Sequence, residues 1–163
     1  MNQKEAIYQK YADLLKEKLV HKYYEYGLNA SGNYEDELEE EIKPRGFTLF
    51  GAQYSEYMDR GRGAGGDYKK IAPLIRGWIE VKTSLPQFFR DNKESLSFAI
   101  AYRIAEEGIQ VPNEYNKGAV VSMVVNDFLA KDIENLIDEV GEVEVQMITS
   151  QITKVFTEMQ AEV

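Results

Sequence analysis

The chain of 163 residues contains no cysteine and a single histidine, His21. The lack of cysteine excludes disulfides, thiolate zinc sites and a thiol nucleophile, and it leaves the redox compartment open. One histidine without suitable partners argues against a histidine metal site or a catalytic triad, so we expect His21 to be an ordinary surface side chain. We therefore expect no catalytic residue, no metal site and no cofactor.

Long apolar runs and an excess of positive charge are also missing. No segment is apolar for long enough to span a bilayer, and the first residues, MNQKEAIYQKYADLLKEKL, lack the apolar core of a signal peptide. We expect a soluble protein that is made in a cytoplasm and has no membrane partner. The net charge of −9 argues against a general nucleic-acid binder, which needs clustered Lys and Arg. It does not argue against a protein that DNA merely passes.

Tyrosine is abundant, with 11 residues in the chain. Tyrosine is enriched at interfaces because its large ring carries a polar tip. For any single tyrosine, a place at the rim of the core is an equally good interpretation. The length predicts one structural domain over residues 1–163, with enough chain for a real core.

The hydrophobic spacing predicts an α+β fold, with about four helices packed on a small, mostly antiparallel sheet. A long amphipathic helix is expected over residues 3–26, ended by Gly27. An acidic segment with the turn Lys43–Gly46 predicts a protruding hairpin over about residues 35–50.

The second half of the chain predicts two further helices and an extended end. Asp91 and Glu94 have the spacing of a capping box, which would open a helix that stops at Gly108. After an exposed loop at Ile109–Lys117, helical spacing resumes over Val121–Val140, and Gly141 is expected to end that helix. Three apolar residues alternate with Glu and Gln beyond it, at Val143, Val145 and Met147. Farther on, the spacing fits a helix but the threonines favour an extended chain, so we predict a C-terminal strand or arm over residues 142–163.

The stretch from Tyr54 to Lys82 carries the most informative pattern in the sequence. An aromatic and charged segment leads into the glycine-dense turn Gly61–Gly66, and an apolar series with helical spacing follows over Ile71–Ile79. The turn matches G-x-G-x-x-G, but the residues before it are too polar for a buried strand and the helix begins after it. We interpret it as a flexible connecting turn and not as a nucleotide site.

A second interpretation of the same stretch is a small Mg-dependent nuclease. In such enzymes two carboxylates hold Mg²⁺ and a lysine assists the attacking water. Asp67 followed by Glu80-x-Lys82 has this pattern. The arrangement requires residues 78–83 to form a strand, whereas their spacing favours a helix, so we keep the nuclease as the alternative hypothesis.

Three segments in a fixed order resemble the tail-completion or neck proteins of tailed bacteriophages. They are YSEYMDRGR at Tyr54–Arg62, IAPLIRGWI at Ile71–Ile79 and FAIAYRIAEEGI at Phe98–Ile109. The resemblance covers about residues 34–112, and the chain beyond Lys117 is less similar.

The resemblance implies a virion structural protein and not an enzyme. Such proteins form homo-oligomeric rings, with six- or twelve-fold symmetry, that join the head to the tail. The expected partners are further copies of the chain and the neighbouring portal, connector or tail proteins, with DNA only in passage. The expected location is the virion, after assembly in the host cytoplasm. Interface candidates are Tyr54, Tyr57, Asp59, Arg60, Arg62 and Trp78.

Overall fold

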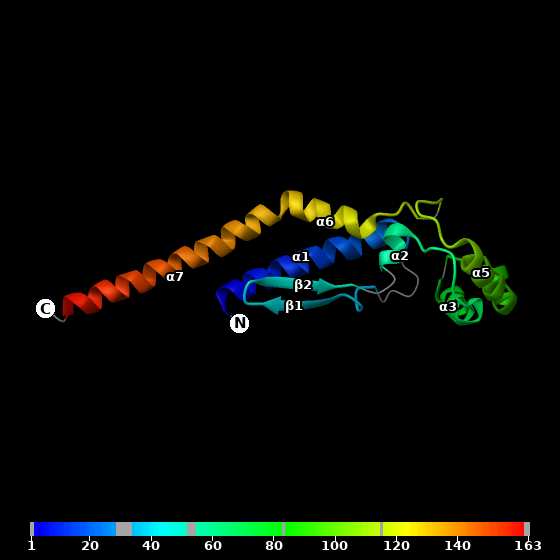
Figure 1. Ribbon diagram of the computed structural model, residues 1–163, viewed down its shortest axis with the longest axis horizontal. Helices are drawn as coiled ribbons and strands as arrows, with labels where there is room; N and C mark the ends of the chain where they lie inside the picture. Colours follow the sequence, from blue (N-terminus) through cyan, green and yellow to red (C-terminus); the bar gives the residue numbers. More distant parts are fainter. Residues whose placement is uncertain (1, 29–33, 52–54, 83, 115, 162–163) are drawn as a thin grey trace.

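The computed structural model describes residues 2–28, 34–51, 55–82, 84–114 and 116–161. These residues form a mostly helical α+β fold, with seven helices and one two-stranded antiparallel hairpin. The elements in chain order are α1 (Gln3–Glu25), β1 (Glu39–Lys43), β2 (Gly46–Phe50), α2 (Ser55–Arg60), α3 (Tyr68–Val81), α4 (Gln87–Asp91), α5 (Lys93–Glu107), α6 (Val120–Lys131) and α7 (Ile133–Ala161). The molecule is elongated, with α3 and α5 at one end and the end of α7 at the other (Figure 1).

The N-terminal helix is confirmed. Asn2 and Glu5 form a capping box, in which the Asn2 side chain accepts from the Glu5 N–H at 2.9 Å and the Glu5 carboxylate accepts from the Asn2 N–H at 2.8 Å. The helix stops before Gly27, whose φ of 65° is accessible to glycine without a Cβ clash. α1 runs along the body of the molecule, beside the hairpin (Figure 1).

The predicted hairpin is confirmed, but it does not protrude. Its strands pair from Glu39 with Phe50 to Lys43 with Gly46, and the hairpin packs along α1. Ile42 and Phe47 contact the apolar cluster beneath it. Because a two-stranded hairpin is marginally stable alone, this packing explains why it lies on the helix.

The core lies between α1, the hairpin, α6 and α7, and not on a broad sheet. One cluster contains Tyr8, Tyr11, Phe128 and Leu136, and a second contains Leu19, Tyr23, Tyr34, Leu38 and Val124. The rings of Tyr23 and Tyr34 stack at 4.1 Å between centroids. These tyrosines are therefore core side chains, as the alternative interpretation of the tyrosine content allows.

Helices α3 and α5 pack on each other as a separate pair, away from α1 (Figure 1). Ile79 and Ala101 are fully buried between them. The predicted capping box at Asp91 and Glu94 is wrong. Asp91 instead ends α4, and α5 follows directly from Asn92, whose side chain bonds back to Phe88 O at 2.9 Å.

The predicted C-terminal strand is also wrong, because residues 142–161 belong to the 29-residue helix α7. The preceding helix ends at Lys131 instead of Val140, and Gly141 lies inside α7. A strand needs a neighbouring strand for its backbone hydrogen bonds, and the described part of the chain offers only the hairpin. A helix satisfies its backbone N–H and C=O groups internally. Residues 142–161 therefore follow the helical spacing of their apolar side chains and not the alternation from Val143 to Met147.

Candidate functional site

The first group of interface candidates lies on α2 and the loop after it. Tyr54 lies outside the described residues, whereas Tyr57 and Arg60 are exposed on α2. Arg60 has no ion pair among the residues that the structure describes. Tyr57 and Arg60 are thus the two members of the group whose side chains are free for contacts outside the chain.

Asp59 forms its hydrogen bonds within the chain. Its carboxylate accepts hydrogen bonds from the backbone N–H of Val121 at 2.7 Å and of Ser122 at 3.3 Å, and it also contacts the Ser122 hydroxyl. The carbonyl of Asp59 accepts from the Ala119 N–H at 2.9 Å. Asp59 therefore caps α6, whose own N-cap residue, Ala119, has no side-chain acceptor.

Arg62 also has intramolecular partners. Its guanidinium donates to Gly65 O at 3.1 Å and to Ile104 O at 3.4 Å, while its backbone pairs with Ile109 in an isolated antiparallel bridge. The glycine turn is thereby fastened to the C-terminal end of α5. Hydrogen bonds hold the predicted flexible connecting turn at Gly61, Arg62 and Gly65, and its flexibility stays a prediction.

Close backbone approach explains two of these glycines. A Cβ on Gly61 would lie 2.2 Å from Ile109 O, and a Cβ on Gly108 would lie 2.2 Å from Arg62 O. Both residues also have positive φ angles, 80° and 75°. The crossing of the two segments thus requires glycine at both positions, and it explains the first glycine of the G-x-G-x-x-G match.

Trp78 lies on the outer face of α3, next to the fully buried Ile79. It shares this face with Leu74 and Val81, which are exposed. Tyr102 and Phe98 add exposed aromatic side chains on α5. The α3–α5 pair therefore exposes apolar side chains on both helices, with three of them on one face of α3.

A second uncovered apolar surface lies on the distal half of α7, where the sequence predicts no helix. Its exposed side chains follow helical spacing: Val145, Ile148, Ile152, Val155, Phe156 and Met159. We name these six residues the α7 ridge. The spacing of three to four residues between apolar positions after Ile148 indicates a helix, but the threonines on the other faces favour an extended chain.

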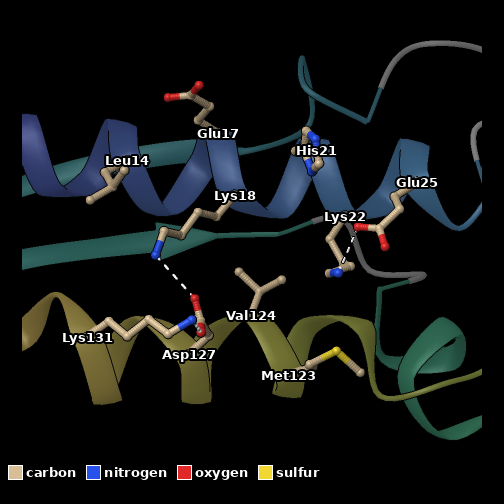
Figure 2. Close-up of a pocket in the computed structure, with 10 residues that line it drawn as sticks. All are labelled: Leu14, Glu17, Lys18, His21, Lys22, Glu25, Met123, Val124, Asp127 and Lys131. Carbon is tan, nitrogen blue, oxygen red and sulfur yellow. Dashed lines mark hydrogen bonds and ion pairs between the residues drawn. The ribbon is translucent and has the colours of Figure 1, made fainter.

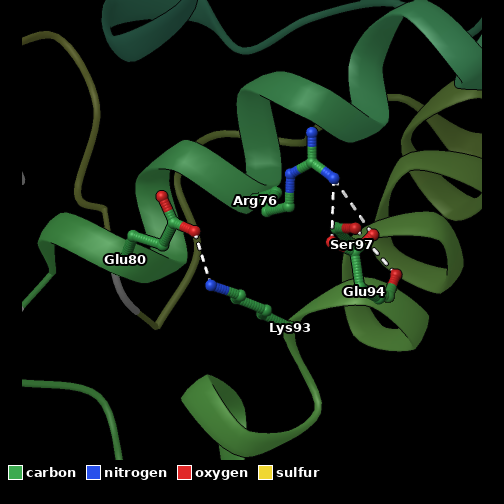
Figure 3. A network of polar contacts seen from close by, with 5 residues as sticks. All are labelled: Arg76, Glu80, Lys93, Glu94 and Ser97. Carbon is green, nitrogen blue, oxygen red and sulfur yellow. Dashed lines mark hydrogen bonds and ion pairs between the residues drawn. The ribbon is translucent and has the colours of Figure 1, made fainter.

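The residues of the nuclease hypothesis are not brought together. Asp67 caps α3 by accepting from the Lys69 N–H at 2.9 Å, whereas Glu80 lies near the other end of that helix. Glu80 accepts from Lys93 Nζ at 2.7 Å, which lowers its pKa (Figure 3). Lys82 donates to Gly27 O at 2.9 Å. Residues 78–81 are helical, so the strand that this chemistry requires is not formed.

The polar contacts between α3 and α5 are structural. Arg76 approaches the Glu94 carboxylate with both oxygens within 3.1 Å, and the Ser97 hydroxyl donates to Glu94 O at 2.8 Å (Figure 3). Among the described residues, no three His, Asp or Glu side chains converge where they could hold a metal ion. None of the described helices has the length and apolar character needed to cross a membrane.

A groove of about 460 Å³ between α1 and α6 is lined in part by charged residues, most of which form ion pairs (Figure 2). Lys18 and Lys131 both reach the Asp127 carboxylate, and Lys22 pairs with Glu25 at 2.7 Å. The hydrogen bond from Lys131 lowers the pKa of Asp127. His21 lies exposed at the rim, as expected for a surface side chain. The Lys18–Asp127 pair joins the two helices, whereas the other two pairs lie within α1 and within α6.

The comparisons with known proteins assign no family. No protein-family model, no curated protein and no solved structure matches the chain significantly.

Proposed function

We propose that this chain is a structural subunit of the tailed-bacteriophage virion, which assembles into a homo-oligomeric ring as a neck or tail-completion component between head and tail. The proposal includes no catalysis and no cofactor. Its partners are further copies of the chain and the adjacent portal, connector or tail proteins.

The large exposed surface carries this proposal. The chain exposes 11210 Å² to solvent, whereas a folded monomer of its mass exposes about 8,300 Å² by the usual scaling. The excess of about 2,900 Å² falls in the range that obligate interfaces bury, roughly 2,000–5,000 Å² in total. An isolated subunit therefore leaves uncovered the amount of surface that assembly would cover.

The character of that surface supports the same proposal. Among the described residues, twenty large hydrophobic side chains are exposed and only fourteen hydrophobic residues are buried. Single exposed hydrophobics are ordinary, but contiguous patches mark interaction sites. The α7 ridge follows one helix face, and Leu74, Trp78 and Val81 share one face of α3.

The positions of the two patches favour contacts with more than one neighbour. They lie at opposite ends of an elongated molecule (Figure 1). A ring requires two different surfaces on each subunit, because every copy contacts its two neighbours heterologously. The place in the phage particle rests on the resemblance of residues 34–112, and the net charge of −9 suits a conduit through which DNA passes without adhering.

Light scattering coupled to size exclusion tests the proposal, on the protein alone and mixed with particle components. We expect a closed multimer of six or twelve times 18.7 kDa in at least one condition. A monomer at high protein concentration under both conditions would refute the ring. Antibody labelling of purified particles then tests the location, with label expected at the head–tail junction.

An arginine variant tests the α2 surface in the same assay. The sequence alone suggests Arg62→Glu, but this change would also remove the hydrogen bonds from Arg62 to Gly65 and Ile104. Arg60→Glu is the cleaner variant because Arg60 is exposed and has no ion pair among the described residues. We expect it to weaken assembly without changing the thermal midpoint, and an unchanged multimer would exclude Arg60 from the interface.

A further inference from the structure

We infer that the α7 ridge of one copy docks into an apolar groove at the α6–α7 corner of a second copy. The inference rests on the proposed ring function and gives it a specific contact. We name this groove the corner groove; its wall includes Tyr8, Phe47, Leu129, Ile133, Ile137 and Gly141. Each subunit thus carries both a donor helix and an acceptor groove, which is the requirement for a head-to-tail contact.

The described part of the donor helix beyond Glu144 buries no side chain in its own subunit. Residues 145–160 are all exposed, and the far half of α7 extends past the hairpin and α1 into solvent (Figure 1). In proteins, most helical stability comes from packing of an amphipathic face and not from intrinsic propensity. An apolar helix face that extends beyond the rest of its own subunit is therefore available to pack against another subunit.

The acceptor groove is apolar and open. It has a volume of about 570 Å³, and Arg45 is its only charged lining residue. Leu129 is 51% exposed and Ile137 is 62% exposed, so the chain itself leaves this wall uncovered. The opposite wall, with Phe47 and Phe128, belongs to the core. The groove thus offers a partly formed core to which one more helix can add.

Gly141 gives the groove room for a large side chain. It lies within α7, and no heavy atom comes within 4 Å of the position where its Cβ would be. A glycine in a helix interior costs about 1 kcal/mol relative to alanine, and packing within this chain does not explain it. Counted at 100° per residue, Gly141 and Ile137 lie on the same side of α7 as the ridge, so groove and ridge form one continuous apolar track.

Uncovered area and balanced charge favour a second copy as the occupant. The chain exposes 11210 Å², about 2,900 Å² more than the usual scaling gives for its mass, and a contact between two copies would cover part of this excess on both of them. Within residues 145–160 the charged side chains are Lys154 and Glu158, which pair with each other, so the ridge brings no net charge to the apolar groove. The residues that flank the centre of the ridge, Thr149 and Gln151, are uncharged. The chain therefore supplies an apolar helix face that suits this groove.

Complementation between two variants tests this contact in the full-length protein. The ridge variant is Ile152→Asp with Phe156→Asp, and the groove variant is Leu129→Asp with Ile137→Asp. All four side chains are more than half exposed, so the changes remove no core contact. Ser150→Asp, on the opposite side of α7, is the matched control, and circular dichroism verifies that each variant remains folded.

We expect each variant alone to lose the multimer and to run as a monomer, while Ser150→Asp keeps the wild-type mass. An equimolar mixture of the ridge and groove variants should form a complex of two chains, because one intact ridge still meets one intact groove. Retention of the multimer by either variant, or absence of the mixed complex, would overturn the docking. If the groove variant still forms the ring, the docking fails and the proposed function stands; if the wild type stops at a dimer that both variants disrupt, the docking stands and the ring fails.

The absence of cysteine makes a direct test possible. Ile137→Cys and Phe156→Cys are made as separate single variants, mixed, and treated with a short bis-maleimide. We expect a cross-linked dimer from this mixture and none when Ser150→Cys replaces Phe156→Cys. The two positions lie about 28 Å apart along one rigid helix, so the same pair of sites in one chain could not produce the link. A dimer of equal yield from the Ser150→Cys control would contradict the contact.

Discussion

The carboxylate of Asp59 accepts a hydrogen bond from the backbone N–H of Val121 at 2.7 Å, so that α2 caps the first turn of α6 from outside that helix. An N-terminal turn leaves N–H groups without partners, and side-chain acceptors there contribute about 0.5–2 kcal/mol. Asp59 thus connects the centre of the chain to the helix that leads into α7.

The Asp59 cap predicts a specific loss of stability. We expect Asp59→Ala to lower the free energy of unfolding by about 1–2 kcal/mol, while Asp59→Asn, which keeps an acceptor, loses less. Asp67→Ala is the comparison, since Asp67 is an exposed cap of α3. Urea denaturation measures all three, and a cost for Asp59→Ala no greater than that for Asp67→Ala would contradict the role in joining α2 to α6.

The glycine turn predicts opposite outcomes at neighbouring positions. Gly61→Ala places a Cβ 2.2 Å from Ile109 O at a φ of 80°, and we expect a loss of more than about 2 kcal/mol. Gly63→Ala meets no heavy atom within 4 Å and needs no positive φ, so it should be nearly neutral. Thermal unfolding of the two variants decides the matter. Equal midpoints would show that residues 61 and 109 do not hold this close contact in solution.

Tyr11 predicts a fall in stability at high pH. Burial and the hydrogen bond to Glu139 raise the pKa of Tyr11 from 10.0 to about 12. Because the folded state favours the neutral phenol, this contribution is complete below pH 10 and is lost as the pH rises towards 12. We expect Tyr11→Phe to flatten the decline of the melting temperature in this window, with exposed Tyr57→Phe as control. An unchanged slope for Tyr11→Phe would contradict the assignment.

Trp78 is the only tryptophan and therefore reports on the α3–α5 surface. Its side chain is 37% exposed in the single subunit. If that surface enters the ring, its emission should shift to shorter wavelength on assembly, and dilution should reverse the shift. Leu74→Ser, on the same face, should weaken assembly without unfolding the chain. Constant emission through assembly would exclude Trp78 from the interface.

Elements with local signals could be predicted from the sequence. Gly27 marks the end of α1, and the turn Lys43–Gly46 marks the hairpin, because the backbone geometry at both places depends on neighbouring residues alone. The roles of Asp59 and Arg62 could not be predicted, since their partners lie about 60 and 40 residues away in the sequence. The charged residues in the motif were recognised, but not that they serve the fold.

The boundary between α6 and α7 shows the same limit. The sequence offers Gly141 as a stop, whereas the chain turns at Asp132, which has neither glycine nor proline beside it. Lys18 reaches across from α1 to Asp132 at 2.5 Å and to Asp127 at 3.3 Å. A tertiary contact marks the corner, so no local pattern could locate it. Beyond the corner, the alternation at Val143 to Met147 was compatible with both periods.

The corner at Asp132 makes α7 a lever. The helix has 29 residues and is therefore about 43 Å long. A tilt of only about 5° at the corner displaces the far end by about 4 Å over that length. A small change of the angle between α6 and α7, where Lys18 of α1 contacts Asp132, thus moves the C-terminal end of α7 by several ångströms. In the proposed ring, a subunit built this way would adjust the reach of α7 towards its neighbour while its body keeps one shape.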